Sequence, residues 1–292
     1  MTESIVILAA GVSSRMKRSL ADLVDEQTAR EADTRTKGMI SVGSGGRPLL
    51  DYLLYNIYRA GYKRVYFVVG SDNALIRSQY GLEDADNNFH GLSISYAVQS
   101  IPEGRSKPLG TADAVFQALV QYPELQSEEF SVCNSDNLYS EKALRVIRCS
   151  AQQNAWINYD RNGMDFPLER INAFAITVVN ESHQLCNIIE KPTPDQIAES
   201  ADPEGIIRVS MNLFKFSGSM FFQYLENCPL NSIRQEKELP TALLNMANDH
   251  REDVVGISIS EHVPDLTEKA DIKTVQDYLD REYGDLSWNQ PV

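Results

Sequence analysis

The sequence feature that most constrains the fold is the apolar segment 5–8, which leads into a turn of small residues. Its apolar side chains do not alternate with polar ones, which predicts a strand buried on both faces, as in a parallel sheet. Residues 9–11 (Ala-Ala-Gly) let a ligand approach the backbone N–H groups, and Arg15 adds a planar cation suited to phosphate. The turn therefore serves phosphate binding or close packing. It matches neither the dinucleotide-binding fingerprint nor the Gly-Lys-Ser/Thr phosphate loop.

Apolar strands and amphipathic helices alternate through the first half of the chain. The pattern predicts strands at 5–8, 65–69, 92–98 and 130–133 and helices at 49–58, 74–80, 111–120 and 141–151. Such alternation is typical of a doubly wound, mostly parallel sheet between two helical layers, a Rossmann-like, three-layer α/β/α architecture. Ligands of such folds bind at the carboxyl ends of the strands.

The second half of the chain has a more mixed pattern. Strands are expected at 155–159, 173–179, 209–216 and 254–259, and helices at 218–225, 239–248 and 269–283. We expect a single domain over 1–284, with halves of about 1–150 and 151–284, and a tail at 285–292. The highly charged segment 17–36 has only a short apolar stripe, which predicts a solvated excursion, a surface lid or a partly disordered loop.

Composition argues against several classes of function. The 27 basic and 41 acidic residues give a net charge of −14, the wrong sign for a nucleic-acid or anionic-membrane surface. The 4 cysteines lack the paired spacing of zinc or redox sites and fit reduced thiols in a cytoplasm. The sequence has no signal-peptide pattern and no apolar run of about 18 residues, so we expect no membrane span.

Polar residues occur where predicted strands end and where one helix begins. Asp136 follows the strand at 130–133, where a carboxylate suits either magnesium in a phosphate site or a helix cap. Gln99 ends another strand and suits the edge of a base, or faces solvent. Gly110 and Thr111 open a helix whose first amides point at whatever lies before it. These residues are candidates for a nucleotide site.

Several short motifs are spread along the chain. They are Leu8-Ala9-Ala10-Gly11 through Arg15-Met16, Lys37 with 39–42 and 47–52, Gln99 with 108–115, Asn134-Ser135-Asp136-Asn137, Glu190-Lys191-Pro192, and Asn212 in the strand that ends at 216. Together, and in this order, they resemble the sugar-phosphate nucleotidyltransferases, or nucleotide-sugar pyrophosphorylases. The resemblance covers residues 5–278 and implies the fold of the nucleotide-diphospho-sugar transferases.

The resemblance implies an enzyme that joins a nucleoside triphosphate to a sugar 1-phosphate, giving a nucleoside diphosphate sugar and pyrophosphate. It implies a magnesium cofactor and no protein nucleophile, with the nucleotide bound by the first half and the sugar phosphate by the second. By position it assigns Arg15, Lys37 and Asp136 to catalysis, Leu8, Ala10, Gly11, Gln99, Gly110 and Thr111 to the nucleotide, Glu190, Lys191 and Asn212 to the substrate, and Asp136 with Asp265 to the metal.

The chain departs from the family pattern at several positions. Ser13 stands where the family turn usually has glycine, and Thr36 precedes the lysine where proline is usual. The segment 100–107 is longer than usual, and its two basic residues, Arg105 and Lys107, are extra phosphate contacts or solvated charges. We prefer Asp265 to Asp271 as the second metal ligand because it follows the last strand, whereas Asp271 falls inside the closing helix.

Three other functions fit parts of the pattern. A glycosyltransferase with a similar sheet would hold a metal and a nucleotide sugar on Asp136, but it needs neither Arg15 nor Lys37. A regulatory subunit would bind nucleotide without turnover, which the changes at Ser13 and Thr36 favour. An enzyme with the same chemistry could accept a phosphorylated alcohol that is not a sugar. A homo-oligomer is compatible with the sequence, although no hexapeptide β-helix, one family route to trimers, follows the last helix.

Overall fold

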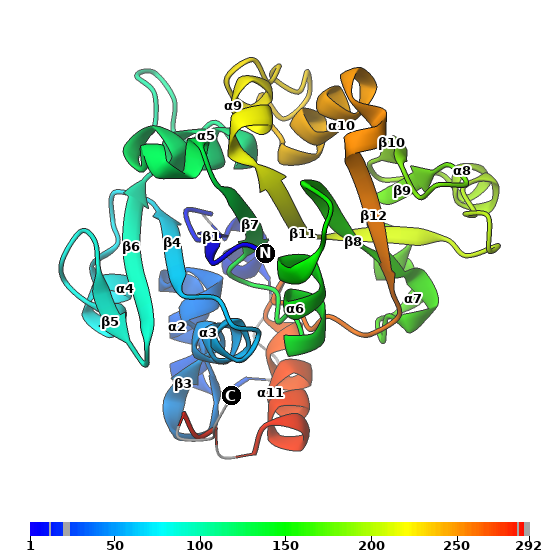
Figure 1. The fold of residues 1–292 in the computed structure, drawn as a ribbon. Coiled ribbons are helices and arrows are strands. Elements are labelled where there is room, and N and C mark those ends of the chain that lie inside the picture. The colour runs from blue at the N-terminus through cyan, green and yellow to red at the C-terminus, as the bar shows by residue number, and fades with distance from the viewer. Residues whose placement is uncertain (12, 20–23, 285, 289–292) are drawn as a thin grey trace.

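The computed structural model describes residues 1–11, 13–19, 24–284 and 286–288. In this part of the chain the main sheet has ten strands, and its middle strands are parallel (Figure 1). β1 (Ser4–Leu8) lies between β7 (Glu129–Asn134) and β4 (Arg64–Val69), and β6 (Leu92–Val98) lies beyond β4. Residues 5–7 are completely buried, as the uninterrupted apolar run predicts.

An antiparallel strand, β11 (Arg208–Ser217), joins these strands to the second half of the sheet. It pairs with β7 and β9 (Ile176–Val179) along one edge and with β8 (Asn154–Asp160) along the other. β12 (Val254–Ile259) runs parallel to β8. The outer strands are β10 (Leu185–Ile189) and β5 (Asn87–Phe89), and β2 (Ser41–Gly43) with β3 (Arg47–Pro48) forms a separate hairpin. The sequence pattern misses β10 because only its first residue is fully buried.

Helices cover both faces of the sheet, which makes three layers (Figure 1). Ile5 and Ile7 face a core shared with α3 (Leu49–Arg59), α6 (Glu141–Cys149) and α11 (Ala270–Glu282). Val6 faces the opposite core, shared with α5 (Thr111–Gln121), α9 (Gly218–Glu226) and α10 (Leu239–Asp249). The other helices are α1 (Ser14–Arg18), α2 (Glu26–Thr34), α4 (Ala74–Tyr80), α7 (Leu168–Ile171) and α8 (Pro194–Glu199). The predicted doubly wound α/β/α fold is confirmed.

None of the helices in the described ranges combines the length and the apolar character that a membrane crossing requires. The charged segment 17–36 is also partly helical, because its centre forms α2. Asp25 caps this helix by accepting hydrogen bonds from two backbone N–H groups, and the buried Glu31 pairs with Arg35 at 2.9 Å. The expectation of a disordered loop is therefore wrong for α2, most of whose side chains are at least partly exposed as a solvated excursion predicts, and the part of the expected apolar stripe at 20–23 lies outside the described residues.

The described part of the tail packs back onto the fold. Leu286 is buried, and the Trp288 ring stacks on His90 with 4.3 Å between ring centroids. Trp288 also meets Tyr55 of α3 edge-on, at 5.5 Å between centroids. These contacts hold residues 286–288 against α3 and the residue that follows β5, although the sequence of the tail shows no pattern.

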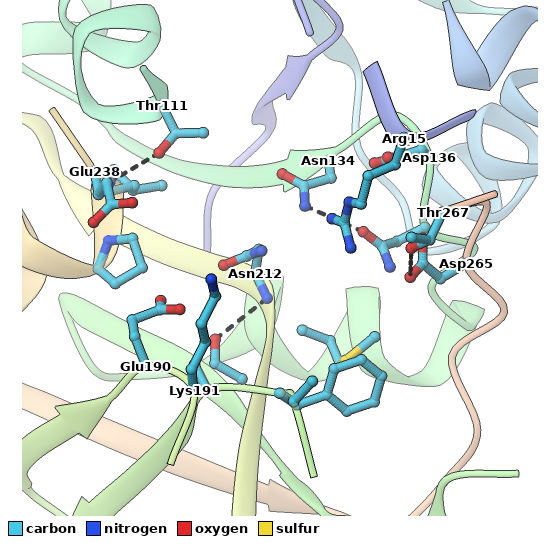
Figure 2. Close-up of a pocket in the computed structure, with 18 of the residues that line it drawn as sticks. Arg15, Thr111, Asn134, Asp136, Glu190, Lys191, Asn212, Glu238, Asp265 and Thr267 are labelled. Atoms are coloured by element: carbon cyan, nitrogen blue, oxygen red, sulfur yellow. Dashed lines mark hydrogen bonds between the residues drawn. The ribbon is translucent and has the colours of Figure 1, made fainter. Parts of the chain in front are cut away.

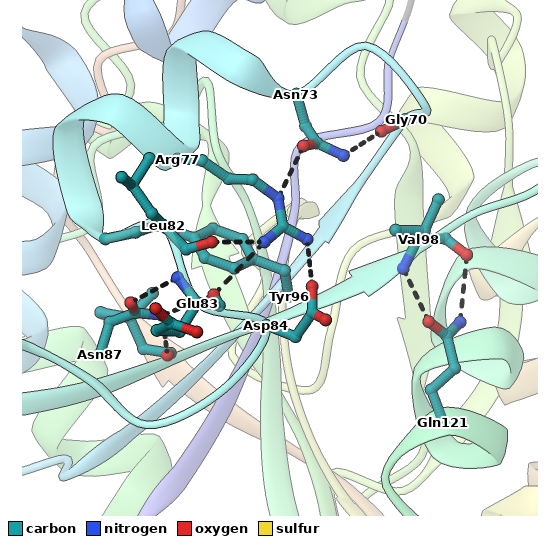
Figure 3. Close-up of polar contacts among 12 residues, drawn as sticks. Gly70, Asn73, Arg77, Leu82, Glu83, Asp84, Asn87, Tyr96, Val98 and Gln121 are labelled. Carbon is teal, nitrogen blue, oxygen red and sulfur yellow. Dashed lines mark hydrogen bonds and ion pairs between the residues drawn. The ribbon is translucent and has the colours of Figure 1, made fainter.

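One arginine holds the loop that connects α4 to the sheet edge (Figure 3). The guanidinium of Arg77 donates to the Asn73 side chain at 2.8 Å, to Asp84 Oδ1 at 2.8 Å and to the backbone carbonyls of Leu82 and Glu83. It also lies over the Tyr96 ring of β6, 4.6 Å from its centroid. A planar fork with several donors is required to make all of these contacts at once.

We expect Arg77→Ala to lower the free energy of unfolding by about 2 kcal/mol, because it removes several hydrogen bonds from a largely buried cation. Urea denaturation measures this loss. The matched control is Arg30→Ala, which removes an arginine from an exposed helical ion pair and should change stability by less than about 0.5 kcal/mol. Equal losses in the two variants would contradict a special role for Arg77.

Candidate active site

A cleft of about 1150 Å³ opens at the carboxyl ends of β1 and β7, beside the irregular middle of β11 (Figure 2). Leu8 of β1, Asn134 of β7 and Asn212 of β11 contribute to its walls. A smaller hollow of about 310 Å³ extends along the turn after β1 and shares Arg15 and Lys37 with the cleft. The carboxyl ends of parallel strands are where an α/β fold places its ligands.

Lys37 and Asp136 form an ion pair in the wall of the cleft. Lys37 Nζ lies 2.7 Å from Asp136 Oδ2, and the two side chains are 14% and 24% exposed. The pair depends on Gly38, which follows the lysine in a short 3₁₀ turn. A Cβ at position 38 would lie 2.6 Å from the Ser135 carbonyl oxygen, so only glycine lets this turn pack against the residue before Asp136.

Asp265 lies beside Asp136 because the segments that follow β12 and β7 pair with each other. Asn137 and Asp265 form an antiparallel bridge, and the Leu266 N–H donates to the Asp136 carbonyl at 3.0 Å. Burial and the nearby Asp136 charge raise the pKa of the Asp265 carboxyl above its usual range. The cleft therefore holds two neighbouring carboxylates whose charges repel each other.

Asp271 has a different position from Asp265. Its carboxylate accepts hydrogen bonds from the backbone N–H groups of Thr267 and Glu268, at 2.7 and 2.8 Å, and pairs with Arg170. Arg170 also pairs with Asp265 Oδ2 at 2.9 Å. Asp265 lines the cleft, whereas Asp271 holds the loop that carries it.

The two carboxylates fit a divalent cation. Among the described residues no group of three or more His, Cys, Asp or Glu side chains gathers around one point, so a cation here would need further oxygen ligands from substrate and water. Magnesium usually takes one or two carboxylates together with phosphate oxygens and water. The raised pKa of Asp265 supports this fit, because a cation would relieve the repulsion from Asp136.

The opposite wall carries Glu190, Lys191 and Asn212 (Figure 2). Lys191 and Asn212 have φ angles of 48° and 59°, in the left-handed region that costs energy for a residue other than glycine. Such strain is found mainly where the surrounding structure holds a functional side chain in place. Burial raises the pKa of Glu190, although the nearby Arg234 opposes this effect.

The turn after β1 supplies the third part of the site. Arg15 of α1 lines both hollows and Gly11 lines the smaller one, whereas Ala10 lines neither. Ser13 has φ 55° and ψ 33°. This left-handed conformation explains why a glycine is usual at this place in the family that the motifs resemble.

Gln99 and Gly110 do not line the cleft. Gln99 is 4% exposed, and its amide nitrogen donates to the Gly110 carbonyl at 2.9 Å and to Asp113 Oδ2 at 2.8 Å. Gly110 packs under Lys237, whose carbonyl oxygen would lie 2.5 Å from a Cβ there and accepts the Ala112 N–H at 2.9 Å. The Ala112 N–H in the first turn of α5 is thus bound to the protein backbone, so it is not free to bind a ligand. Thr111 does reach the cleft.

Sequence reasoning missed several charged residues of the cleft wall, among them Arg170, Arg234 and Glu238. Arg170 precedes the loop into β9, and Arg234 and Glu238 lie between α9 and α10, where Arg234 Nη1 is 2.7 Å from Glu238 Oε1. The spacing of four residues between opposite charges is a weak signal that would have suggested this pair. No local pattern marks Arg170, because its partners Asp265 and Asp271 are distant in sequence.

Comparison with curated proteins finds glucose-1-phosphate adenylyltransferases among the relatives of this chain. A glucose-1-phosphate adenylyltransferase of Photobacterium profundum is 25% identical over 228 residues, 76% of this chain and 50% of that protein. The protein of the same name from Nitrosomonas europaea is 24% identical over 222 residues, 75% of this chain and 47% of its own length. The chain thus spans about half the length of these curated relatives.

A solved structure supports the fold, and a family model covers most of the chain. The crystal structure of UDP-glucose pyrophosphorylase complexed with UDP-glucose matches with a TM-score of 0.70 and 14% identity, covering 97% of this chain and 100% of that one. The family model described as nucleotidyl transferase matches residues 32–281. The chain therefore belongs to the nucleotidyl transferase family, as its motifs predict.

Proposed function

We propose that this protein joins a nucleoside triphosphate to a sugar 1-phosphate and releases pyrophosphate, in a magnesium-dependent reaction. The observation that carries the proposal is a single cleft with the Lys37, Asp136 and Asp265 group on one wall and Glu190 and Lys191 on another. The names of the relatives, glucose-1-phosphate adenylyltransferase and UDP-glucose pyrophosphorylase, support this class of reaction. The four cysteines are free thiols, which fits the cytoplasm that we propose as its location.

The proposed reaction brings two anions together. A phosphate oxygen of the sugar 1-phosphate attacks the α-phosphorus, forming a new P–O bond, and the bond from the α-phosphorus to the bridging oxygen breaks, so that pyrophosphate leaves. Arg15 and Lys37 would bind the triphosphate and offset the charge of the leaving group, while Lys191 would hold the sugar phosphate. No covalent intermediate with the protein is needed, and catalysis depends on alignment and charge.

Asp136 and Asp265 would hold the magnesium ion. When bound, this ion would neutralise charge on the phosphate oxygens during the transfer. Lys37 would hold the Asp136 carboxylate close to the phosphates, since it pairs with that carboxylate at 2.7 Å. Arg170 would orient Asp265 by pairing with it, because a second ion pair, with Asp271, holds the Arg170 guanidinium in place.

The cleft also accounts for binding an anion to a chain of net charge −14. Its walls gather seven basic residues from distant parts of the sequence: Arg15, Arg18, Lys37, Lys107, Arg170, Lys191 and Arg234. Seven acidic residues line the same cleft, so its formal charge is balanced rather than negative, and the basic side chains can bind phosphate groups there.

A nucleotide-binding subunit without turnover is the second candidate. It is favoured by Ser13 and Thr36, which depart from the family pattern close to Arg15 and Lys37. In that case the protein would bind a triphosphate without releasing pyrophosphate.

The first test measures pyrophosphate release with magnesium over a grid of nucleoside triphosphates and sugar 1-phosphates. We expect one productive pair, and Asp136→Asn should abolish its turnover. If no combination of substrates released pyrophosphate while a triphosphate still raised the Tm, the result would support the second candidate or an acceptor that is not a sugar phosphate. Binding at about 100 times the Kd stabilises a protein by about 2.7 kcal/mol, so the Tm shift would be measurable. Release of free nucleoside diphosphate from a nucleotide sugar would indicate a glycosyltransferase.

We expect Lys37→Ala and Asp136→Asn each to lower kcat/KM by about 100- to 1000-fold, because each removes a charge that the transition state needs. Circular dichroism should show an unchanged fold. The matched controls are Lys273→Ala and Asp277→Asn, which break an exposed lysine–aspartate pair on α11. These controls should keep near-normal kinetics. Near-normal activity in the two cleft variants would contradict the proposed site.

Magnesium titration separates the two candidate ligands on the last segment. We expect Asp265→Asn to raise the magnesium concentration for half-maximal activity by about tenfold or more, because it removes a charged ligand. Asp271→Asn should lower thermal stability, since it breaks the ion pair with Arg170, and it should raise the magnesium requirement by less than Asp265→Asn does, because Asp271 acts on Asp265 only through Arg170 and the loop. The reverse pattern would assign the ligand to Asp271.

A further inference from the structure

The strand β11 contains a bulge that presents Asn212 to the cleft. Its pairing with β8 is regular up to Ser210 and again from Phe214, with a register shift between them. Within the bulge, Asn212 has a φ of 59°, and the residue lines the cleft. In the view of Figure 2, Asn212 lies between the Asp136 side and the Lys191 side.

The bulge leaves the end of β7 without its usual partner. β7 pairs with β11 only as far as Val132, opposite Phe214. The Ser135 N–H donates to Leu8 of β1, so the preceding N–H, that of Asn134, points to the β11 side. A buried N–H in this position requires an acceptor.

The hydroxyl of Tyr139 fills the gap. It accepts the Asn134 N–H at 3.3 Å and donates to the Met211 carbonyl at 2.7 Å, with the Asn212 carbonyl oxygen at 3.2 Å. The ring is completely buried, and burial raises the pKa of the phenol, so the hydroxyl keeps its proton. The Tyr139 carbonyl in turn accepts from the Asn56 side chain of α3 at 2.8 Å, which anchors the residue from behind.

We propose that Tyr139 is a positioning residue whose hydroxyl holds the β11 bulge in the shape that aims Asn212 at the acceptor, and joins that bulge to the strand leading to Asp136. The proposal rests on the proposed function, in which Asn212 touches the acceptor. Tyr139 touches no substrate itself, because it lies in the core behind the cleft.

The hydroxyl matters here because the bulge is strained, and its contacts with the Met211 and Asn212 carbonyls restrain the backbone there. A left-handed φ at a residue other than glycine persists only when neighbouring groups enforce it. The Asn212 N–H also donates to Ser210 Oγ, at 3.3 Å, but this contact lies within the bulge itself. Tyr139 links the bulge carbonyls to the segment that follows β7. Without its hydroxyl, the ring would still pack while the bulge carbonyls would lose their donor.

The experiment compares Tyr139→Phe with a matched control, Tyr159→Phe. Both tyrosines are completely buried, but the Tyr159 hydroxyl has no hydrogen-bond partner in the described part of the chain. We expect Tyr139→Phe to lower kcat/KM for the sugar phosphate by about tenfold while the KM for the triphosphate stays the same, since a small misplacement of a positioning group is costly. Tyr159→Phe should match the wild type. Equal kinetics in the two variants would overturn the proposal.

A double-mutant cycle shows whether Tyr139 acts through Asn212. Asn212→Gly removes the side chain and tolerates the positive φ. If the proposal holds, adding Tyr139→Phe to Asn212→Gly should cost little more activity, because the two changes remove the same function. Effects that multiply would show that Tyr139 acts by another route, and would overturn the proposal.

Amide hydrogen exchange at residues 211–213 gives a readout independent of turnover. We expect faster exchange there in Tyr139→Phe than in Tyr159→Phe, because the bulge loses its restraint. If no substrate pair turned over in the wild type, the proposed function would fail, and with it the catalytic meaning of Asn212. Exchange would then still decide the structural part, and unchanged rates at 211–213 would overturn it.

Discussion

The site depends on the contact between two segments that are far apart in sequence, the one after β7 and the one after β12. The bridge between Asn137 and Asp265, with the hydrogen bond from Leu266 to Asp136, fixes two carboxylates side by side. Each strand ends at the same side of the sheet, so the topology brings the segments together, and the backbone hydrogen bonds set their register. The other charges of the cleft are arranged around this pair.

Two like charges in a partly buried cleft are stable only if cations lie close to both. Lys37 serves Asp136 and Arg170 serves Asp265, so each carboxylate has its own basic partner. Lys37 lies in the first 3₁₀ turn and Arg170 in α7, and the loop after β12 carries Asp265. The two ion pairs therefore also hold these separate segments against one another. Electrostatics and tertiary structure are therefore coupled at this point.

The strands of the first half and the class of fold could be predicted from sequence, because each depends on a local apolar pattern. Arg15, Lys37, Asp136 and Asp265 could be placed near one another because they follow strands or turns at one edge of the sheet. The rest depends on partners that sequence alone does not identify. The Gln99 side chain points inward because the Gly110 carbonyl and the Asp113 carboxylate accept hydrogen bonds from its amide nitrogen. The helix α2 forms because Asp25 caps it and Glu31 pairs with Arg35.

Gly38 has no reactive group, yet the site requires it. The space beside it is filled by the Ser135 carbonyl, so a larger residue would have to push apart the two segments that carry Lys37 and Asp136. Sensitivity to substitution in this protein is thus not confined to residues with chemistry of their own. A position that contributes only the absence of a side chain is as restricted in sequence as the ion pair next to it.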